Sequence, residues 1–153
     1  MNLNIGCGDR RYENLIGVDV RRTPAVDVQS DIRKLPFKDN SIDNIAAEDV
    51  AEHFRRTELP AVLKEWHRVL KSNGVLRIKT PYFSFIVQLF TSRRIPQVEA
   101  ARKLYGNQDY PENTHYTCYD PSELGAVLEA AGFQLTHLFK TDNTNFILDG
   151  VKP

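Results

Sequence analysis

The sequence predicts a three-layer α/β domain with a mainly parallel β-sheet. Three observations favour this class. Four short apolar runs come before residue 50, and each is too short to form a helix. A stretch with helical periodicity follows at Leu59–Leu70. Another helical stretch and two strand-like segments then occupy the C-terminal third, an order typical of a sheet with helices packed against it.

The four apolar runs are predicted to be buried strands. They lie at Leu3–Ile5, Leu15–Val20, Val26–Val28 and Ile42–Ala47. Their apolar character fits a sheet that is covered on both faces. The first two runs are closer together than the roughly twelve residues that a parallel crossover normally needs. The first crossover helix is therefore expected to be reduced to about one turn.

The helix at Leu59–Leu70 has recognisable ends. Thr57 is the expected N-cap, and Pro60 falls in the first turn, where its missing N–H is harmless. Asn73–Gly74 is expected to end the helix, and Val75–Lys79 then reads as the next strand. The residues that repeat at helical spacing and form the apolar face are Leu59, Val62, Leu63, Trp66, Val69 and Leu70.

The C-terminal half is predicted to contain further helices and a hairpin. Helical segments are expected near Phe85–Ser92 and Pro96–Tyr105, followed by an irregular loop. Asp120 is the expected N-cap of a last helix, with Pro121 at its first position and Gly132 after its end. An antiparallel hairpin at a sheet edge should then be formed by the strands Phe133–Phe139 and Asn145–Val151 and the turn Lys140–Thr144.

Composition favours one soluble domain that spans residues 1–153. Nothing resembles a signal peptide, and no apolar stretch is long enough for a membrane span. With only two cysteines, a disulfide framework is not expected and a cytoplasmic location fits best. A formal net charge of zero argues against a nucleic-acid binder. A small-molecule partner is therefore expected, rather than a membrane or nucleic acid.

A glycine turn follows the first predicted strand and marks a candidate ligand site. Gly6, Cys7 and Gly8 lie where open α/β sheets bind ligands, at the carboxyl ends of the strands. Glycine lets the backbone approach a ligand closely, and free amide groups there can face its polar end. Cys7 is interpreted as a small residue in this turn and not as a nucleophile.

Two acidic residues at later strand ends extend this pattern. Asp19 ends the second apolar run, where its carboxylate can accept hydrogen bonds from both ribose hydroxyls of an adenosine. Asp31 follows the third run and precedes Ile32, so that a carboxylate stands beside an apolar wall. That combination suits an adenine ring with an exocyclic amine. Each aspartate alone can equally be a cap or turn residue, but the ordered set favours an adenosine site.

These motifs resemble those of the class I S-adenosylmethionine (SAM)-dependent methyltransferases, especially the small group related to the type 11 methyltransferases. The resemblance implies a Rossmann-like fold and SAM as the cofactor. It covers residues 3–81 and resumes less tightly at residues 104–106 and 128–133. Its motifs are Leu3–Gly8, Gly17–Asp19, Ser30–Phe37, Ile45–Phe54 and Trp66–Leu76.

By this likeness, a defined set of residues should hold the cofactor. Ala47 and Glu48 should border its sulfonium end, with Glu52–His53 just beyond. Three departures are noted: the helices that members usually carry before the first strand are missing, the helix after the glycine turn is nearly absent, and Glu48 and Asp49 replace the more usual Ser or His. The residues expected to bind SAM are Gly6, Cys7, Gly8, Asp19, Asp31, Ile32, Ala47 and Glu48.

Methyl transfer mainly requires alignment of the acceptor with the activated methyl group. A general base helps when the acceptor is a hydroxyl, and His53 and His115 are the candidates. Alternatively, His53 orients nearby backbone and His115 makes only local bonds in its loop. Tyr82, Tyr105 and Tyr116 can line the acceptor pocket. No bound metal is expected.

Two other functions are considered. A nicotinamide-binding oxidoreductase would need a third glycine where Arg11 stands and an acidic residue about 20 positions on, whereas Asp19 comes sooner. A non-catalytic SAM-binding module that acts through a protein partner is the stronger alternative. A homo-oligomer or a partner protein could then cover the open cofactor site. The favoured function is methyl transfer to an unidentified acceptor, with a small molecule or sugar preferred.

Overall fold

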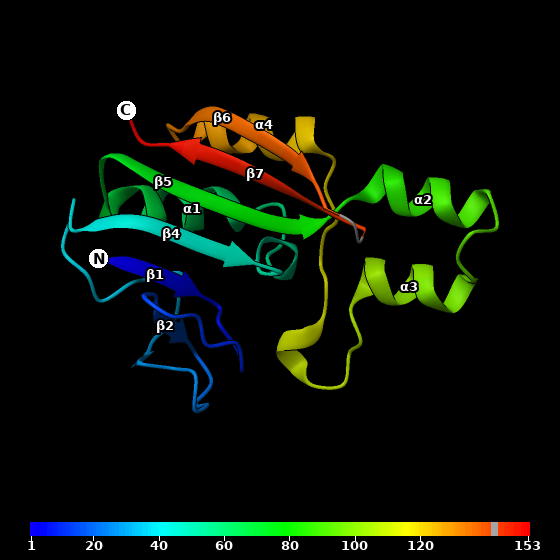
Figure 1. The fold of residues 1–153 in the computed structure, drawn as a ribbon, viewed down its shortest axis with the longest axis horizontal. Helices are drawn as coiled ribbons and strands as arrows, with labels where there is room; N and C mark the ends of the chain where they lie inside the picture. The colour runs from blue at the N-terminus through cyan, green and yellow to red at the C-terminus, as the bar shows by residue number, and fades with distance from the viewer. Residues whose placement is uncertain (142–143) are drawn as a thin grey trace.

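The structure is a computed structural model that describes residues 1–141 and 144–153. In this part of the chain, the strands form one seven-stranded sheet of order β3-β2-β1-β4-β5-β7-β6 (Figure 1). Neighbours from β3 to β5 are parallel, whereas β7 is antiparallel to both β5 and β6. The strands are β1 (Asn2–Ile5), β2 (Ile16–Asp19), β3 (Val28–Gln29), β4 (Ile42–Glu48), β5 (Leu70–Pro81), β6 (Gln134–Lys140) and β7 (Asn145–Val151).

This topology confirms the predicted class, a mainly parallel α/β sheet with a C-terminal antiparallel hairpin. Positions 142 and 143 of the predicted hairpin turn lie outside the described residues. None of the described helices is long and apolar enough to cross a membrane. The helices are α1 (Leu59–Val69), α2 (Phe83–Thr91), α3 (Gln97–Tyr105) and α4 (Pro121–Ala130), with 3-10 turns η1 (Ala51–His53) and η2 (Pro111–Asn113).

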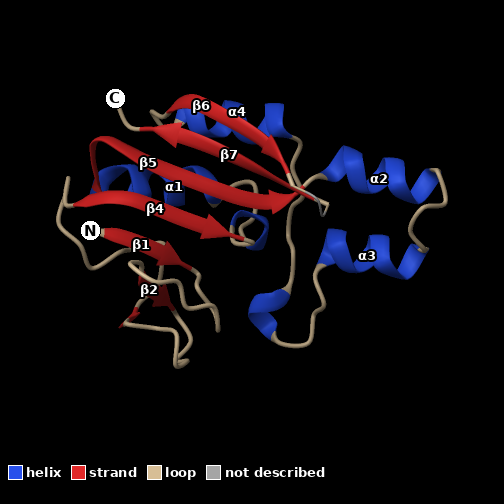
Figure 2. Cartoon of the chain, in the orientation of Figure 1, coloured by secondary structure: helices blue, strands red, loops and turns tan. Residues whose placement is uncertain are grey.

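Among the residues that the structure describes, helices cover one face of the sheet and leave the other open. α1 and α4 lie behind the strands in Figure 2. The His67 ring of α1 contacts the ring of Phe133, which follows α4, edge-on at 5.1 Å between centroids. α2 and α3 form a separate pair beyond the end of β5 (Figure 2). Among the described residues, the links between β1 and β4 contain no helix. The second helical layer that a three-layer fold requires is therefore not formed by these connections, which are too short or too rich in turns to contain a helix.

The uncovered face is polar and internally paired. Along β5, Ile78 is buried under the helices while Arg77, one position earlier, is exposed on the other face. Alternation of this kind is typical of a sheet with one solvated face. Side chains on this face bond to one another across neighbouring strands at 2.7 to 2.9 Å, in the pairs Arg77 with Asp149, Lys79 with Glu48 and Asn44 with Asn2.

Pro60 lies in the first turn of α1 as predicted, but the N-cap predicted at Thr57 and the stop predicted at Asn73–Gly74 are wrong. The helix begins at Leu59 with Glu58 in the N-cap position, and no side-chain cap is formed by Thr57 or Glu58. It ends at Val69 and not at Asn73–Gly74, because Leu70 turns to an extended conformation and pairs with Ile42. Sheet pairing therefore takes over from the helical pattern several residues earlier than the glycine indicates.

The predicted cap of α4 is correct in position but not in chemistry. Asp120 occupies the N-cap, yet its side chain makes no capping bond. One carboxylate oxygen instead accepts from the backbone N–H of Ser84 at 2.9 Å, and the hydroxyl of Ser84 donates to the other. This contact ties the start of α4 to the start of α2.

Trp66 joins the core to a loop at the carboxyl end of the sheet. Its side chain is completely buried in α1, and its indole Nε1 donates to the carbonyl oxygen of Ile32 at 2.9 Å. Edge-on contact with Phe54, at 6.3 Å between ring centroids, also ties it to the segment after η1. One core residue thus fixes two of the loops that border the carboxyl ends of the strands.

Replacing Trp66 with Phe should destabilise the protein by about 1–3 kcal/mol, because it opens a cavity and leaves the Ile32 carbonyl without its donor. Urea unfolding followed by far-UV circular dichroism measures the change. Val98→Ala, at a position that is 66% exposed on α3, is the control and should change stability little. Equal stability of the two variants would contradict the anchoring role of Trp66.

Candidate active site

A large cavity opens at the carboxyl ends of β1, β2 and β4. Its volume is about 880 Å³, within the usual range for small-molecule and cofactor sites. The lining comes from the loops after β1 to β4 and from residues 103–116, which include η2. Arg21 lies over the Tyr110 ring at 4.8 Å and so bridges two of these loops across the cavity. The sheet thus places its cavity where open α/β sheets bind ligands.

The glycine turn after β1 has the backbone conformation that glycine favours. Gly6 and Gly8 have φ of +62° and +55°, in the left-handed region. A Cβ added at Gly6 would come within 2.6 Å of a methyl group of Val50, so the position has no room for a side chain. The backbone N–H of Gly8 donates to the Asp19 carboxylate at 2.8 Å. The turn is therefore held against the end of β2.

Asp19 is buried at the end of β2 and faces the cavity. Its side chain is only about 9% exposed. One oxygen accepts from Gly8 N–H and the other from the backbone N–H of Arg21, both at 2.8 Å. An ionised carboxylate has about four acceptor positions. Capacity therefore remains for hydroxyl donors of a ligand.

Asp31 and Ile32 line the same cavity on the side of β3. Asp31 is engaged by Arg33, whose guanidinium binds both carboxylate oxygens at 2.7 to 3.0 Å. This partner lowers the pKa of Asp31 below its usual value. Ile32 is half-buried, and Trp66 holds its carbonyl. The predicted pair of a carboxylate and an apolar wall is therefore present, with the carboxylate ionised and paired.

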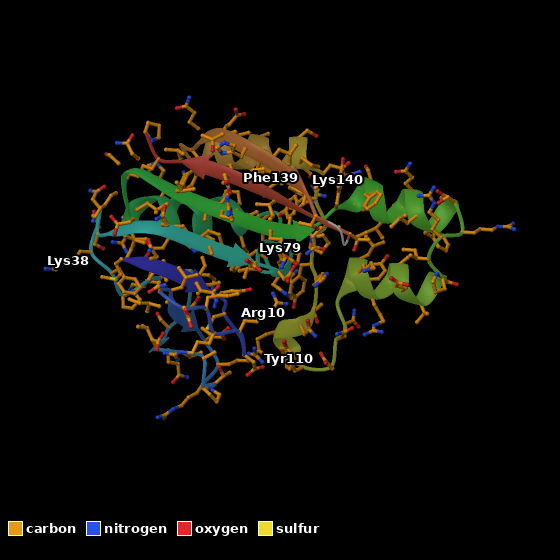
Figure 3. The ribbon with its side chains drawn as sticks, viewed as in Figure 1. Arg10, Lys38, Lys79, Tyr110, Phe139 and Lys140 are labelled. Carbon is orange, nitrogen blue, oxygen red and sulfur yellow. The ribbon has the colours of Figure 1, made fainter. Side chains whose placement is uncertain are left out.

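Glu48 and Asp49 form a charged cluster with two cations at the end of β4. Lys79 Nζ lies 2.9 Å from Glu48 and 3.4 Å from Asp49, and Arg10 Nη1 lies 2.8 Å from Asp49. Figure 3 shows Arg10 and Lys79 beside this end of the sheet. Ala47 is completely buried and is not among the cavity residues. Side chains along β4 alternate between the two faces of the sheet, and that of Ala47 points into the core. The expectation that Ala47 borders the cofactor does not fit this geometry.

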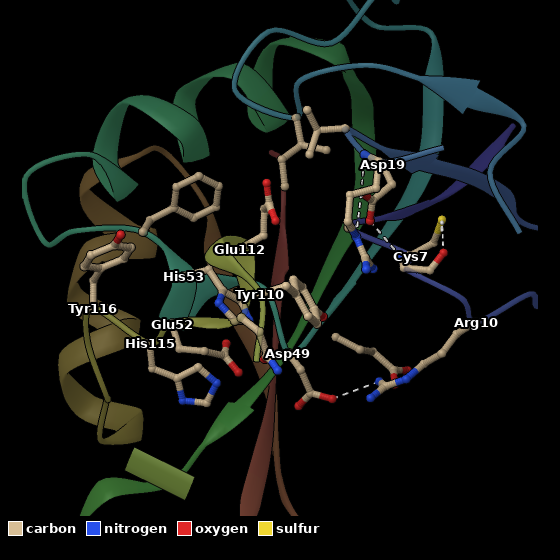
Figure 4. Close-up of a pocket in the computed structure, with 18 of the residues that line it drawn as sticks. Cys7, Arg10, Asp19, Asp49, Glu52, His53, Tyr110, Glu112, His115 and Tyr116 are labelled. Carbon is tan, nitrogen blue, oxygen red and sulfur yellow. Dashed lines mark hydrogen bonds and ion pairs between the residues drawn. The ribbon is translucent and has the colours of Figure 1, made fainter. Parts of the chain in front are cut away.

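Glu52, His53 and His115 meet at the other end of the cavity (Figure 4). The two imidazole rings are edge-on, with centroids 4.9 Å apart. His53 Nδ1 lies 3.0 Å from the Thr114 carbonyl, and His115 Nδ1 lies 3.1 Å from the Lys103 carbonyl. Burial lowers the pKa of both histidines, and the proximity of His53 lowers that of His115 further. Both imidazoles are therefore favoured in the neutral form.

Glu52, the residue before His53, is fully buried. Its Oε2 accepts from the Thr80 hydroxyl at 2.8 Å, whereas Oε1 has no hydrogen-bond partner among the described residues. Burial, with a contribution from Asp49, raises the pKa of Glu52 to about 8. The backbone carbonyl of Glu52 accepts from Tyr116 and Thr117, and these bonds dock the His115 loop onto η1.

Residues 3–78 match a family profile described as "Methyltransferase domain". They contain the glycine turn, both aspartates and the charged end of β4. The chain belongs to the class I, type 11-like methyltransferases. SAM is therefore its cofactor, as the motifs predicted. No curated protein sequence matches the chain.

Solved methyltransferase structures share the fold at low sequence identity. A SAM-dependent methyltransferase of Thermotoga maritima, described as a possible histamine N-methyltransferase, is 20% identical, with 99% of this chain and 82% of that chain covered and a TM-score of 0.68. The 1,6-didemethyltoxoflavin-N1-methyltransferase of Burkholderia thailandensis was solved with S-adenosylhomocysteine. It is 15% identical, with 99% of this chain and 70% of that chain covered and a TM-score of 0.70. A complex of the Haloferax volcanii Trm112 methyltransferase activator with a putative methyltransferase is also similar. The identity is 16%, with 99% of this chain and 82% of that chain covered and a TM-score of 0.66.

The structure gathers most of the residues that the sequence singled out in this methyltransferase. Apart from Ala47, every predicted cofactor residue and both histidines line one cavity. Of the predicted aromatic lining, only Tyr116 is present, while Tyr12 and Tyr110 replace Tyr82 and Tyr105. The resemblance placed Glu52 just beyond the sulfonium end of SAM but gave its side chain no chemical role. The position of an acidic residue directly before His53 could have indicated a role for Glu52. The burial of this side chain, however, follows only from the fold.

The thiols of this methyltransferase should be unreactive in the native state. Burial raises the pKa of Cys7 to about 11 and that of Cys118 to about 12. A raised thiol pKa favours the neutral form, so the reactive thiolate is a small fraction of the thiol at pH 8. At pH 8 we expect Cys7 in a Cys118→Ser variant to react with Ellman's reagent about 100-fold more slowly in the native protein than in urea.

Stopped-flow absorbance at pH 7, 8 and 9 measures this reaction. The native rate should rise about tenfold per pH unit across this range, because the thiolate is the reactive form. Equal native and unfolded rates would show that the Cys7 thiol is neither buried nor neutral.

Proposed function

We propose that this protein transfers the methyl group of SAM to a small-molecule or sugar acceptor bound in the same cavity. The observation that carries the proposal is the arrangement of the cavity. It has a glycine turn and a buried carboxylate at one end and two neutral histidines at the other. Residues 1–153 act as one catalytic domain in this proposal. A cytoplasmic location is included because both cysteines are free.

The cofactor is assigned to the end formed by β1, β2 and β3. Gly6, Cys7 and Gly8 would face the amino-acid part of SAM through their backbone, and Asp19 would accept from the ribose hydroxyls. Asp31 and Ile32 would contact the adenine. Glu48 would lie near the sulfonium, whose positive charge its carboxylate favours.

The acceptor is assigned to the end that contains His53 and His115. In the reaction, an acceptor lone pair forms a bond to the methyl carbon, and the C–S bond breaks with its electron pair left on sulfur. The products are the methylated acceptor and S-adenosylhomocysteine. An acceptor hydroxyl must also lose its proton, and a neutral imidazole within reach can assist that loss.

A small acceptor is favoured over a macromolecule. The cavity has room for a ligand of moderate size, and the formal net charge of the chain is zero. The structurally similar enzyme from Burkholderia thailandensis acts on 1,6-didemethyltoxoflavin, which is a small molecule. The acceptor of this protein is therefore best sought in a panel of small hydroxylated and amine compounds.

A non-catalytic SAM-binding module that works through a protein partner is the second candidate. The uncovered sheet face and the similarity to a methyltransferase that forms a complex with Trm112 favour it. The two functions differ in turnover. Release of S-adenosylhomocysteine in the presence of an acceptor panel would support the enzyme, whereas tight SAM binding without release would favour the module.

Asp19→Ala should weaken SAM binding by about 1–3 kcal/mol, because ribose hydroxyls would lose their acceptor. Isothermal titration calorimetry measures the dissociation constant, with NAD as a ligand that should not bind. Asp39→Ala is the matched control, since Asp39 pairs with Arg68 and does not line the cavity. An unchanged dissociation constant in a folded Asp19→Ala protein would refute the ribose assignment.

His115→Ala should leave the SAM dissociation constant within about twofold of the wild-type value but slow turnover of a hydroxyl acceptor by about 100-fold. The reason is that His115 is assigned to the acceptor end and not to the cofactor end. Calorimetry and a coupled assay for S-adenosylhomocysteine give the two values. His137→Ala, at an exposed position on β6, serves as control. Selective loss of SAM binding would contradict the placement of the acceptor.

A further inference from the structure

Three potential metal ligands converge at the end of the cavity. Glu52, His53 and His115 each offer one ligand atom, and these atoms all lie within 4.8 Å of one another. Their side chains point toward a common region in Figure 4. Two histidines and one glutamate form a ligand set that zinc enzymes use at catalytic sites. No metal was expected from the sequence, in which His115 is 62 positions from His53.

Backbone carbonyls fix the protonation of both imidazoles. A carbonyl oxygen can only accept a hydrogen bond, so Nδ1 must carry the proton in His53, which faces Thr114, and in His115, which faces Lys103. In a neutral imidazole this leaves the lone pair on Nε2. A bond from the second ring nitrogen to a carbonyl is the arrangement that orients metal-binding histidines in proteins.

Glu52 supplies a buried oxygen atom that has no other described function. The side chain is 0% exposed, and Oε1 lacks a hydrogen-bond partner among the described residues. Buried polar atoms are rarely left in this state, and a bound ion is one of the recognised explanations. Thr80 holds the other oxygen at 2.8 Å and so fixes the orientation of the carboxylate.

We propose that Glu52, His53 and His115 bind a divalent transition metal ion of the Zn²⁺ type at the acceptor end of the cavity. Three protein ligands leave at least one coordination position open, which can take water or an oxygen of the acceptor. A bound cation would lower the pKa of that oxygen and favour its anionic form. Only this catalytic role rests on the proposed methyl transfer; metal binding itself does not.

The geometry requires a small closure of the site. Ligand atoms around tetrahedral Zn²⁺ lie about 3.3 Å apart, as follows from bond lengths near 2.0–2.1 Å. In the structure the three ligand atoms are up to 4.8 Å apart. To bind the ion, they must therefore approach one another by about 1–2 Å. His115 lies in the loop after η2, outside the hydrophobic core. With a metal bound, both histidines would act through the ion and not as free bases.

Titration of the full-length protein with Co²⁺, without SAM or acceptor, tests this proposal. Visible absorption of bound Co²⁺ reports its coordination, and competition with Zn²⁺ gives the zinc affinity. We expect one ion per chain, with binding weakened more than about 100-fold in Glu52→Gln and in His115→Ala, beyond the loss typical of outer-shell changes. His137→Ala should bind like the wild type.

Glu52→Gln retains the shape of the side chain and a possible bond to Thr80, so its folding can be verified by circular dichroism. His115→Ala changes a loop residue and provides a second, independent variant. Equal affinity of the wild type, Glu52→Gln and His115→Ala would overturn the site, as would binding of Mg²⁺ in preference to Zn²⁺. Because SAM is absent from the titration, failure here leaves the methyltransferase proposal intact. Failure of that proposal would instead appear as a lack of SAM binding or turnover.

Discussion

The core of this protein is one-sided, and the rest of the structure is arranged around that constraint. Parallel sheets are normally covered on both faces, but here α1 and α4 lie on one face only (Figure 2). Apolar side chains are therefore concentrated on that face, where Trp66, Ile45 and Ile78 are buried. On the other face, polar groups must be satisfied by neighbours or by water. The Arg77–Asp149 pair does this for a carboxylate that is only 3% exposed.

The charged groups of the uncovered face continue into the cavity. Glu48 and Lys79 pair across β4 and β5 at the carboxyl end of the sheet. The chain then turns sharply at Asp49, which has φ of +56°. Glu52 follows and is directed into the interior instead of the solvent. The one-sided sheet therefore brings a balanced ionic cluster and a buried carboxyl group close together, in the region to which we assign the sulfonium end of SAM.

The sequence predicted the sheet better than the ends of the helices. Short apolar runs identified the strands because buried strands need apolar residues, and Gly6–Gly8 and Asp19 marked the strand ends because a turn with positive φ favours glycine. Thr57 and Asn73–Gly74 failed as helix boundaries for α1. Both signals are local, whereas the observed ends depend on pairing of Leu70 with Ile42 in the assembled sheet. Local patterns therefore predict elements, and tertiary pairing decides where they stop.

The histidine pair shows why the site itself could be predicted only in part. His53 and His115 are separated in sequence by α1, β5, α2, α3 and η2, and no local pattern relates them. Their proximity follows from backbone bonds between Glu52 and residues 116–117. The same docking brings the Thr114 carbonyl to His53 and so fixes which nitrogen of that ring holds the proton. A sequence can name two histidines as bases, but only the folded loop brings a ligand atom of each within 4.8 Å of the other and of a Glu52 oxygen. Convergence of three donor atoms is what distinguishes a metal site from two independent bases.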